Sequence, residues 1–328
     1  MRTKYVLKRI LYVIPVSLGV LIVVFLLLHL MPGGPASALL GPEATAEDVA
    51  RVRAQLGLDQ NIFVQLFVYM KQLLTFDFGN SIIYSASVSS MLKSAFPATL
   101  ELAIVAMIIA LLISLPLGIL SAVKQNSWID NISMFLAQLG ISMPVFWMGL
   151  LMILLFSVHL DWLPSFGRGE PLLSAIGVWL SQGDFSVLAN SLKKIIMPAA
   201  ALGIMGSAMI SRMIRSTMLD VLDMDYIRTA RAKGTGRFKV IMKHAFRNAL
   251  LPMVTLLGLT LPDIVSGSFI IETIFGWPGM GRLGVNSILQ RDYPVVMAVT
   301  MISALMVVCG NLAADILYAV VDPRIKQG

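Results

Sequence analysis

Six long apolar segments constrain the fold of this chain more than any other feature of its sequence. A hydrocarbon core of roughly 30 Å is crossed by a helix of about 17–25 apolar residues. The segments that meet this length are approximately residues 10–31, 98–123, 134–158, 196–217, 250–274 and 295–320. Only 13% of the residues are charged, against about a quarter in soluble domains. The sequence therefore predicts an all-α polytopic membrane protein with six transmembrane helices.

The first apolar segment resembles a secretory signal, because Lys8 and Arg9 precede it and residues 36–38 read Ala-Ser-Ala. Its apolar stretch is 22 residues long, from Ile10 to Met31, whereas the apolar region of a signal peptide has about 7–15 residues. We therefore expect an uncleaved first helix.

The basic residues indicate which side of the membrane each loop faces. Both termini and the loops on their side carry 16 Lys and Arg residues, and the longer loops on the other side carry nine. Short cytoplasmic loops are enriched in Lys and Arg, so we expect both termini to be cytoplasmic. The net charge of +7 is then a topology signal that also suits anionic lipid headgroups. We expect no nucleic-acid partner.

Residues 225–252 form a basic insert between two apolar segments, in a region with nine Lys and Arg residues between Arg212 and Arg247. Burial in lipid does not require such an insert, so we interpret it as a docking element for another protein on the cytoplasmic side. Gly234 and Gly236 are expected to divide it into two short helical stretches, since glycine interrupts helices.

The largest loop on the other side, residues 32–97, is predicted to contain two short helices. Thr45 is placed to cap the first, over 49–56, and Gly57 to end it. The second is expected over 61–74, where apolar residues recur on one face. Such helices could lie on the membrane surface or receive an extracytoplasmic partner, and the sequence leaves both alternatives open.

Motifs of enzymatic chemistry are absent from the sequence. It contains no phosphate-binding P-loop, and the Gly-rich run 279–284 lacks the preceding strand of a dinucleotide site, so we interpret it as an outer turn. The three histidines are not spaced with Cys, Asp or Glu as in a zinc site. Cys309 is the single cysteine. We expect no catalytic residue, no metal and no cofactor.

Four carboxylates fall in or near the predicted spans, where charge is costly and often functional: Glu101, Asp263, Glu272 and Asp315. Glu101 and Glu272 lie near the outer ends, where water or an arginine can reach them. Asp263 is in mid-span, close to Ser266 and Ser268, and these three are the predicted lining of a translocation path for a cationic or amine-bearing solute. A hydrogen bond from Asp263 to a neighbouring helix is an equal alternative. A single such acid argues against an ion-coupled carrier.

The basic insert resembles the cytoplasmic EAA loop in permease subunits of ATP-binding-cassette importers. Arg228-Thr229-Ala230, three further residues and Gly234 keep that loop's spacing, although Arg228 and Thr229 replace Glu and Ala. The closing Leu-Pro is displaced to residues 251–252. Both departures resemble the dipeptide/oligopeptide/nickel branch of these permeases, of the dipeptide-permease B type. Further stretches similar to that branch are residues 98–102, 272–279, 291–294 and 322–325.

The resemblance implies a type I importer fold. Residues 1–93 would hold the first helix and an extracytoplasmic segment, residues 94–321 a five-helix core with the coupling loop 218–249, and residues 322–328 a cytoplasmic tail. The implied partners in the bacterial inner membrane are a homologous second permease, two ATPases that hydrolyse ATP, an extracytoplasmic solute-binding protein and lipids. The implied ATPase-coupling residues are Arg228, Thr229, Ala230, Arg231, Lys233 and Gly234. The three basic ones would pair with acidic groups, while Ala230 and Gly234 would permit close packing.

The sequence and the resemblance together predict a permease subunit for short peptides that performs no chemistry itself. Nickel, a metal–chelator complex and glutathione are alternative solutes within the same class of importer. A secondary carrier or channel that works without ATPases is an alternative of another class. An intramembrane hydrolase is disfavoured, because no nucleophile and base can be recognised.

Overall fold

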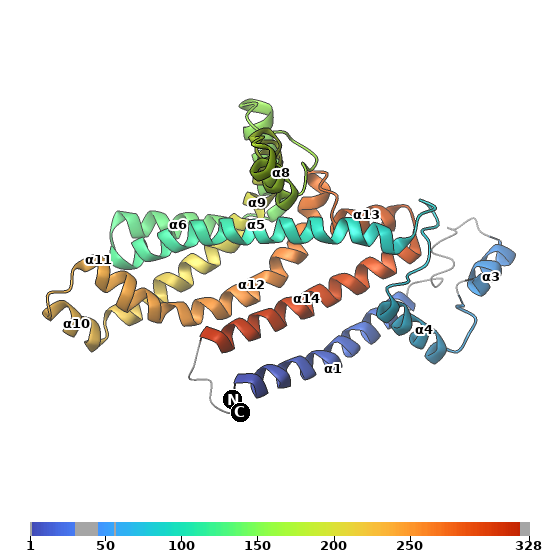
Figure 1. Ribbon diagram of the computed structural model, residues 1–328, viewed down its shortest axis with the longest axis horizontal. Coiled ribbons are helices and arrows are strands. Elements are labelled where there is room, and N and C mark those ends of the chain that lie inside the picture. The colour runs from blue at the N-terminus through green and yellow to red at the C-terminus, as the bar shows by residue number, and fades with distance from the viewer. Residues whose placement is uncertain (1, 30–44, 56, 322–328) are drawn as a thin grey trace. The chain divides into compact units, whose positions relative to one another are not determined.

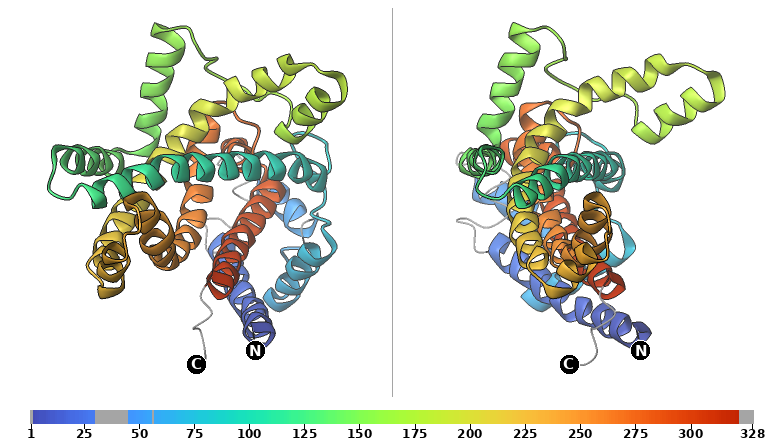
Figure 2. Two further views of the ribbon diagram at one scale, coloured as in Figure 1. Left: turned by 60° about the vertical axis from the view of Figure 1, so that its left-hand side comes forward. Right: turned by 90° about the vertical axis from the view of Figure 1, so that its left-hand side faces the viewer.

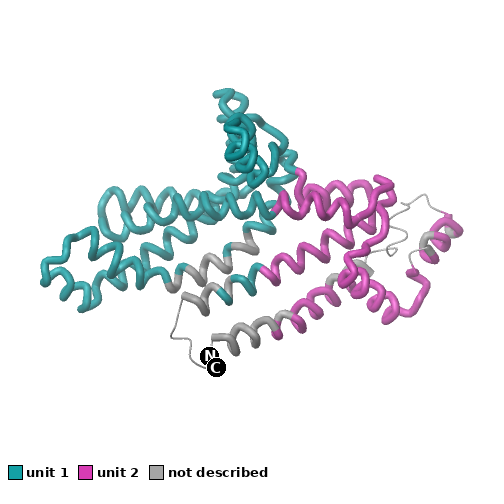
Figure 3. Tube along the Cα trace, in the orientation of Figure 1, with its two compact units in different colours: residues 1–9, 100–277, 310–328 teal, residues 10–99, 278–309 magenta. Residues whose placement is uncertain are grey.

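The computed structural model describes residues 2–29, 45–55 and 57–321, and these residues are mainly helical (Figure 1). They fall into two compact units (Figure 3). Unit 1 comprises residues 1–9, 100–277 and 310–328, and unit 2 comprises residues 10–99 and 278–309. The helices are α1 Arg2–His29, α3 Ala46–Gln55, α4 Ile62–Thr75, α5 Val88–Val123, α6 Trp128–Ser142, α7 Val145–Met152, η1 Ile153–His159, α8 Leu172–Gln182, α9 Phe185–Leu222, α10 Asp225–Ala232, α11 Arg237–Lys239, η2 Val240–Phe246, α12 Arg247–Ile274, α13 Met280–Leu289 and α14 Tyr293–Val321.

Unit 1 is built around α9, which packs against α6, α7, α8 and α12. Glycines let α5 approach α9 closely at two levels. A Cβ atom at Gly203 would lie 2.8 Å from the carbonyl oxygen of Ala106, and one at Gly118 would lie 2.7 Å from the Cβ of Ile214. Small residues at such crossings are the usual means of packing helices in a membrane. The start of α9 with α8, and α7 with η1, project from the rest of unit 1 as two arms (Figure 2).

Within the described residues, each predicted span falls on helical structure, in α1, α5, α6 with α7 and η1, α9, α12 and α14. By length and composition, three helical stretches of the described residues can cross a membrane: Val88–Val123, Phe185–Leu222 and Tyr293–Ala313. The pair formed by α6 and α7 with η1 counts as a fourth if it is one span. The helical, multi-span character of the chain is therefore established, and the number six stays a prediction.

The segment predicted as one span over 134–158 differs in the structure, because it bends by 105° between Ser142 and Val145. Pro144 lacks a backbone N–H and disfavours the helical conformation in the residue before it. Met143 is accordingly extended, with φ −86° and ψ 128°, and α7 starts afresh after Pro144. Pro198 lies inside α9 without breaking it, so proline alone does not decide where a helix ends.

Unit 2 contains the two predicted short helices as α3 and α4. The Thr45 hydroxyl accepts from the Asp48 N–H at 3.2 Å, and Gly57 has a left-handed φ of +66° beyond the end of α3. The Asn61 side chain caps α4 by accepting from the Phe63 N–H at 3.0 Å. The predicted cap at Thr45 and the predicted end before Gly57 are confirmed. The first helix begins at Ala46, three residues before the predicted start at residue 49.

Candidate functional site

The basic insert forms two helical stretches, as its glycines predict. The first is α10, and the second begins with α11 and continues through η2 into α12. Gly234 and Gly236 lie in the turn between them. Gly234 has φ +75°, and a Cβ atom there would meet nothing within 4 Å. The backbone conformation therefore requires this glycine, since a left-handed φ is strained for residues with a Cβ.

Helix α10 has an inner and an outer face. Ile227 is fully buried and Ala230 is 9% exposed, and both join a cluster with Met218 of α9 and Val240 of η2. Ala230 thus serves packing within unit 1. The remaining implied coupling residues are exposed on the outer side and the following turn: Arg228, Thr229, Arg231, Lys233 and Gly234.

The outer side of this segment is strongly basic. Between residues 224 and 247 the sequence has seven Lys and Arg residues and one acid, Asp225. The carboxylate of Asp225 lies 3.7 Å from the guanidinium of Arg228, and both side chains are largely exposed. This ion pair therefore neutralises little of the positive charge of the surface.

A hollow of about 400 Å³ opens beside this surface. Two arginines, one threonine and four aliphatic residues line it. The lining residues are Val123, Leu222, Arg231, Thr235, Arg237, Val240 and Ile241. Arg237 and Thr235 were not among the predicted site residues. Their places between the turn glycines and directly after them are the signal that could have identified them.

Of the three residues predicted to line a path, two have side chains that the structure describes, Ser266 and Ser268. The Asp263 side chain lies outside the described set. Ser266 is exposed. Ser268 is fully buried, and its hydroxyl donates to the Val265 carbonyl at 2.7 Å and lies 3.2 Å from an oxygen of Glu272, which is itself buried.

Glu101 has an arginine partner, as expected for an acid near the end of a span. Arg168 donates to it from Nε at 2.9 Å and also from Nη2, and the N–H of Leu172 at the start of α8 donates to its other oxygen. The guanidinium of Arg168 lies 5.4 Å from the ring centre of Trp277, within cation–π range. This cluster fixes the base of the arm that contains α8.

A second ion pair, which the sequence analysis missed, joins α6 to α9. Asp130 is 1% exposed, and it accepts from Nε of Arg215 at 2.6 Å and from Nη2 at 2.7 Å. The Ser121 hydroxyl and the Asn126 N–H, at 2.9 Å, donate to the same carboxylate. The partners are 85 positions apart in the chain, so no local pattern reveals the pair.

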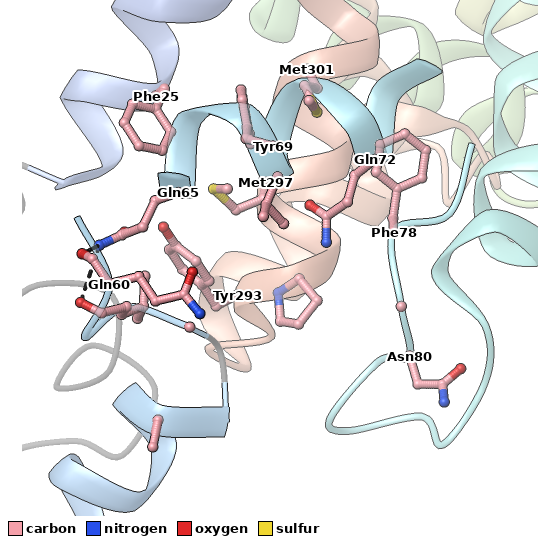
Figure 4. A pocket seen from close by; sticks show the side chains of 16 residues that line it. Phe25, Gln60, Gln65, Tyr69, Gln72, Phe78, Asn80, Tyr293, Met297 and Met301 are labelled. Carbon is pink, nitrogen blue, oxygen red and sulfur yellow. Dashed lines mark hydrogen bonds between the residues drawn. The ribbon is translucent and has the colours of Figure 1, made fainter. Parts of the chain in front are cut away.

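Unit 2 contains a hollow of about 540 Å³ between α4, the chain at residues 78–80 and the start of α14 (Figure 4). We call it the outer chamber. The lining residues that the structure describes are all uncharged: Phe25, Ala54, Gly57, Leu58, Gln60, Gln65, Val68, Tyr69, Gln72, Phe78, Gly79, Asn80, Tyr293, Pro294, Met297 and Met301. Among the described residues, no group of three or more His, Cys, Asp or Glu could hold a metal ion.

Family models match nearly the whole chain. Residues 114–327 match the model described as binding-protein-dependent transport system inner membrane component, and residues 2–103 match the model of an N-terminal region of such membrane components.

Individual relatives agree in length with the chain. It is 44% identical to the dipeptide transport system permease protein of Alkalihalophilus pseudofirmus, over 98% of this chain and 99% of that protein. It is 42% identical to the oligopeptide transport system permease protein of Bacillus subtilis, over 98% and 99%. It is also 42% identical to the glutathione transport system permease protein of Salmonella typhi, over 98% of each.

A solved structure supports the fold. A chain of the inward-facing MetNI methionine ABC transporter superposes with a TM-score of 0.56 at 19% identity, over 71% of this chain and 96% of that one.

Proposed function

The chain belongs to the family of binding-protein-dependent transport system inner membrane components, and we propose that it is a permease subunit of an ATP-driven importer of short peptides. Near-full-length identity of 42–44% to dipeptide and oligopeptide permeases supports the peptide substrate. The observation that carries the proposal is the basic, exposed surface of α10 and the turn after it, which offers a docking site to a partner.

The proposed assembly contains a homologous second permease, two ATPases on the cytoplasmic side and an extracytoplasmic solute-binding protein in a bacterial inner membrane. In it, residues 94–321 form the core, residues 1–93 supply the first helix and an extracytoplasmic segment, and residues 322–328 are a tail. The chain crosses the membrane six times, with both termini in the cytoplasm. ATP is hydrolysed by the partners, and this chain catalyses no reaction.

Charge complementarity defines the proposed contact with an ATPase. Three basic side chains are exposed on this surface: Arg228, Arg231 and Lys233. Asp225 is the one acidic residue between residues 224 and 247. An acidic groove of a partner would therefore accept charge-assisted hydrogen bonds from these side chains. Arg231 and Arg237 flank the 400 Å³ hollow, which suits a partner carboxylate that is carried beside an apolar side chain. Thr229 adds a hydroxyl to this surface. Ala230 anchors α10 from the inside, and Gly234 provides the turn.

Packing gives a route by which this contact could move the helices. Ile227 of α10 and Met218 of α9 belong to one buried cluster, so α10 and the end of α9 move together. The Asp130–Arg215 ion pair then joins α9 to α6 and to the turn after α5. Because packed interfaces switch between discrete arrangements, closure of the ATPases would shift these helices as a group.

The translocation path is proposed to include Asp263, Ser266 and Ser268 of α12. The hydrogen-bond distance between Ser268 and Glu272 adds a buried acid to this region. Glutathione is a second candidate solute, favoured by the 42% identity to the glutathione permease and by its peptide-like chemistry. Nickel or a metal–chelator complex is an alternative solute that no observation favours over peptides. A carrier that works without ATPases is an alternative class of transporter that no observation favours over the importer.

Affinity purification of the tagged chain from its native membrane in a mild detergent, followed by mass spectrometry, tests the proposal. We expect a second permease and two ATPases to be recovered with it. A chain that is recovered alone or as a homo-oligomer from several gentle detergents would contradict the importer and favour the carrier or channel.

A further inference from the structure

We propose that the outer chamber of unit 2 binds an uncharged main-chain loop of the extracytoplasmic binding protein, with an apolar side chain of that loop inside it. This inference rests on the proposed function, which supplies the partner and places this end of α14 outside the membrane. The volume of about 540 Å³ is in the range of sites that enclose a ligand of a few residues.

The polar groups of the chamber are carboxamides. Gln72 extends from α4 into the space bordered by Tyr293 and Phe78 (Figure 4). Gln65 donates to the carbonyls of Leu58 at 3.1 Å and Gln60 at 2.8 Å, and so belongs to the wall. The side chains of Gln72 and Asn80 have no hydrogen-bond partner among the described residues. A carboxamide has the same donors and acceptor as a peptide group, so these two can pair with a main chain.

Two phenols add further unpaired polar groups. The hydroxyls of Tyr69 and Tyr293 are buried and lack a hydrogen-bond partner within the described chain. Tyr69 is 2% exposed, and burial raises its pKa above the usual range, so its hydroxyl stays protonated and can donate. Buried polar groups normally have partners. A side-chain shift that turns either phenol toward a bound carbonyl would satisfy it.

The described part of the lining carries no charged side chain, which favours an internal stretch of polypeptide as the occupant. A free dipeptide carries an ammonium and a carboxylate, and burying either without a counter-charge is costly. The described lining residues offer neither a carboxylate for the ammonium nor a basic group for the carboxylate. Met297, Met301 and Phe25 instead form an apolar wall, and methionine adapts to side chains of different shape. A loop inside a folded protein brings amides and apolar side chains and no terminal charges.

The chamber is preformed on the side of residues 78–82. Asp292, which is fully buried, accepts from the Ser81 hydroxyl and from the Ile82 N–H at 3.3 Å. The Val88 N–H donates to the Gly79 carbonyl at 3.0 Å. These bonds hold this segment beside the start of α14. A wall that is already ordered lowers the entropy cost of binding.

The first test measures the affinity of the purified binding protein for the complete complex in nanodiscs. In Gln72→Trp an indole fills the chamber, and we expect the Kd to rise about tenfold or more, which corresponds to about 1.4 kcal/mol. Lys71→Trp is the matched control, because Lys71 is exposed and does not line the chamber; its Kd should be that of the wild type. ATPase activity without binding protein should stay unchanged in both, which reports intact folding. A wild-type Kd for Gln72→Trp overturns the proposal.

The second test identifies the occupant by placing the photoreactive residue p-benzoylphenylalanine at position 72 or, as the control, at position 71. We expect an adduct with the binding protein from position 72 only. Adducts with a short transported peptide, with lipid alone, or with the binding protein equally from both positions would overturn the assignment. If the wild-type complex is not stimulated by binding protein at all, the proposed function itself fails; if stimulation is normal and position 72 is silent, only the chamber assignment fails.

Discussion

The Asp130–Arg215 pair predicts an asymmetric response to the loss of either partner. The Asp130 side chain is 2% exposed and that of Arg215 is 25% exposed. In Arg215→Met the Asp130 carboxylate stays buried, with only the Ser121 hydroxyl and the Asn126 N–H as partners. We therefore expect the free energy of unfolding to fall by about 3–5 kcal/mol, the usual result of leaving a buried charge unpaired. In Asp130→Asn the guanidinium of Arg215 can reach water, so we expect the free energy of unfolding to fall by only about 1–3 kcal/mol.

Thermal unfolding of the single variants and the double variant in the same nanodiscs measures this difference. The melting temperature should fall most for Arg215→Met, less for Asp130→Asn, and in the double variant less than the sum of the two, because neighbouring residues are not additive. Equal effects of the single variants, or strict additivity, would refute the reasoning that the burial of Asp130 dominates.

Three further predictions concern particular side chains. Gly234→Ala should lower the free energy of unfolding by about 1–2 kcal/mol, because Ala is strained at a left-handed φ, and it should also lower peptide uptake. Gly236 has φ −56°, so Gly236→Ala should change uptake much less. Gly203→Leu should destabilise unit 1 by about 1–3 kcal/mol or more in thermal unfolding, and Gly177→Leu, which has open space around it, should not. Ile227→Asn should abolish ATPase recovery in affinity purification, since it places an unpaired amide in the cluster that holds α10; normal recovery would show that α10 docks without its inner face.

Much of the helical architecture could be predicted from the sequence. Apolar runs define helices in lipid because every backbone group must be paired within the segment. Within the described residues, each predicted span therefore falls on helical structure, although the span over 134–158 is divided at Pro144. The caps at Thr45 and Gly57 and the division of the basic insert at Gly234 were predicted from local chemistry, which depends on neighbouring residues only.

What could not be predicted depends on contacts between distant residues. Pro144 and Pro198 occur in similar apolar surroundings, yet only the first interrupts a helix, and the neighbouring sequence does not distinguish the two. Arg215 and Asp130 are too far apart in sequence to be paired by inspection. The inward direction of Ala230 follows from the cluster on α9 and η2, and the outer chamber is assembled from three separate segments.

The most direct test of the central claim measures binding-protein-stimulated ATPase activity and peptide uptake in proteoliposomes that contain the whole complex. The test variant is a double variant that carries both Arg231→Glu and Arg237→Glu. The control is Lys239→Glu, which reverses a charge on the same segment but outside the 400 Å³ hollow. We predict that the double variant assembles but loses stimulated activity and uptake, while the control keeps most of both. Full stimulation and uptake in the double variant would contradict coupling through this basic surface.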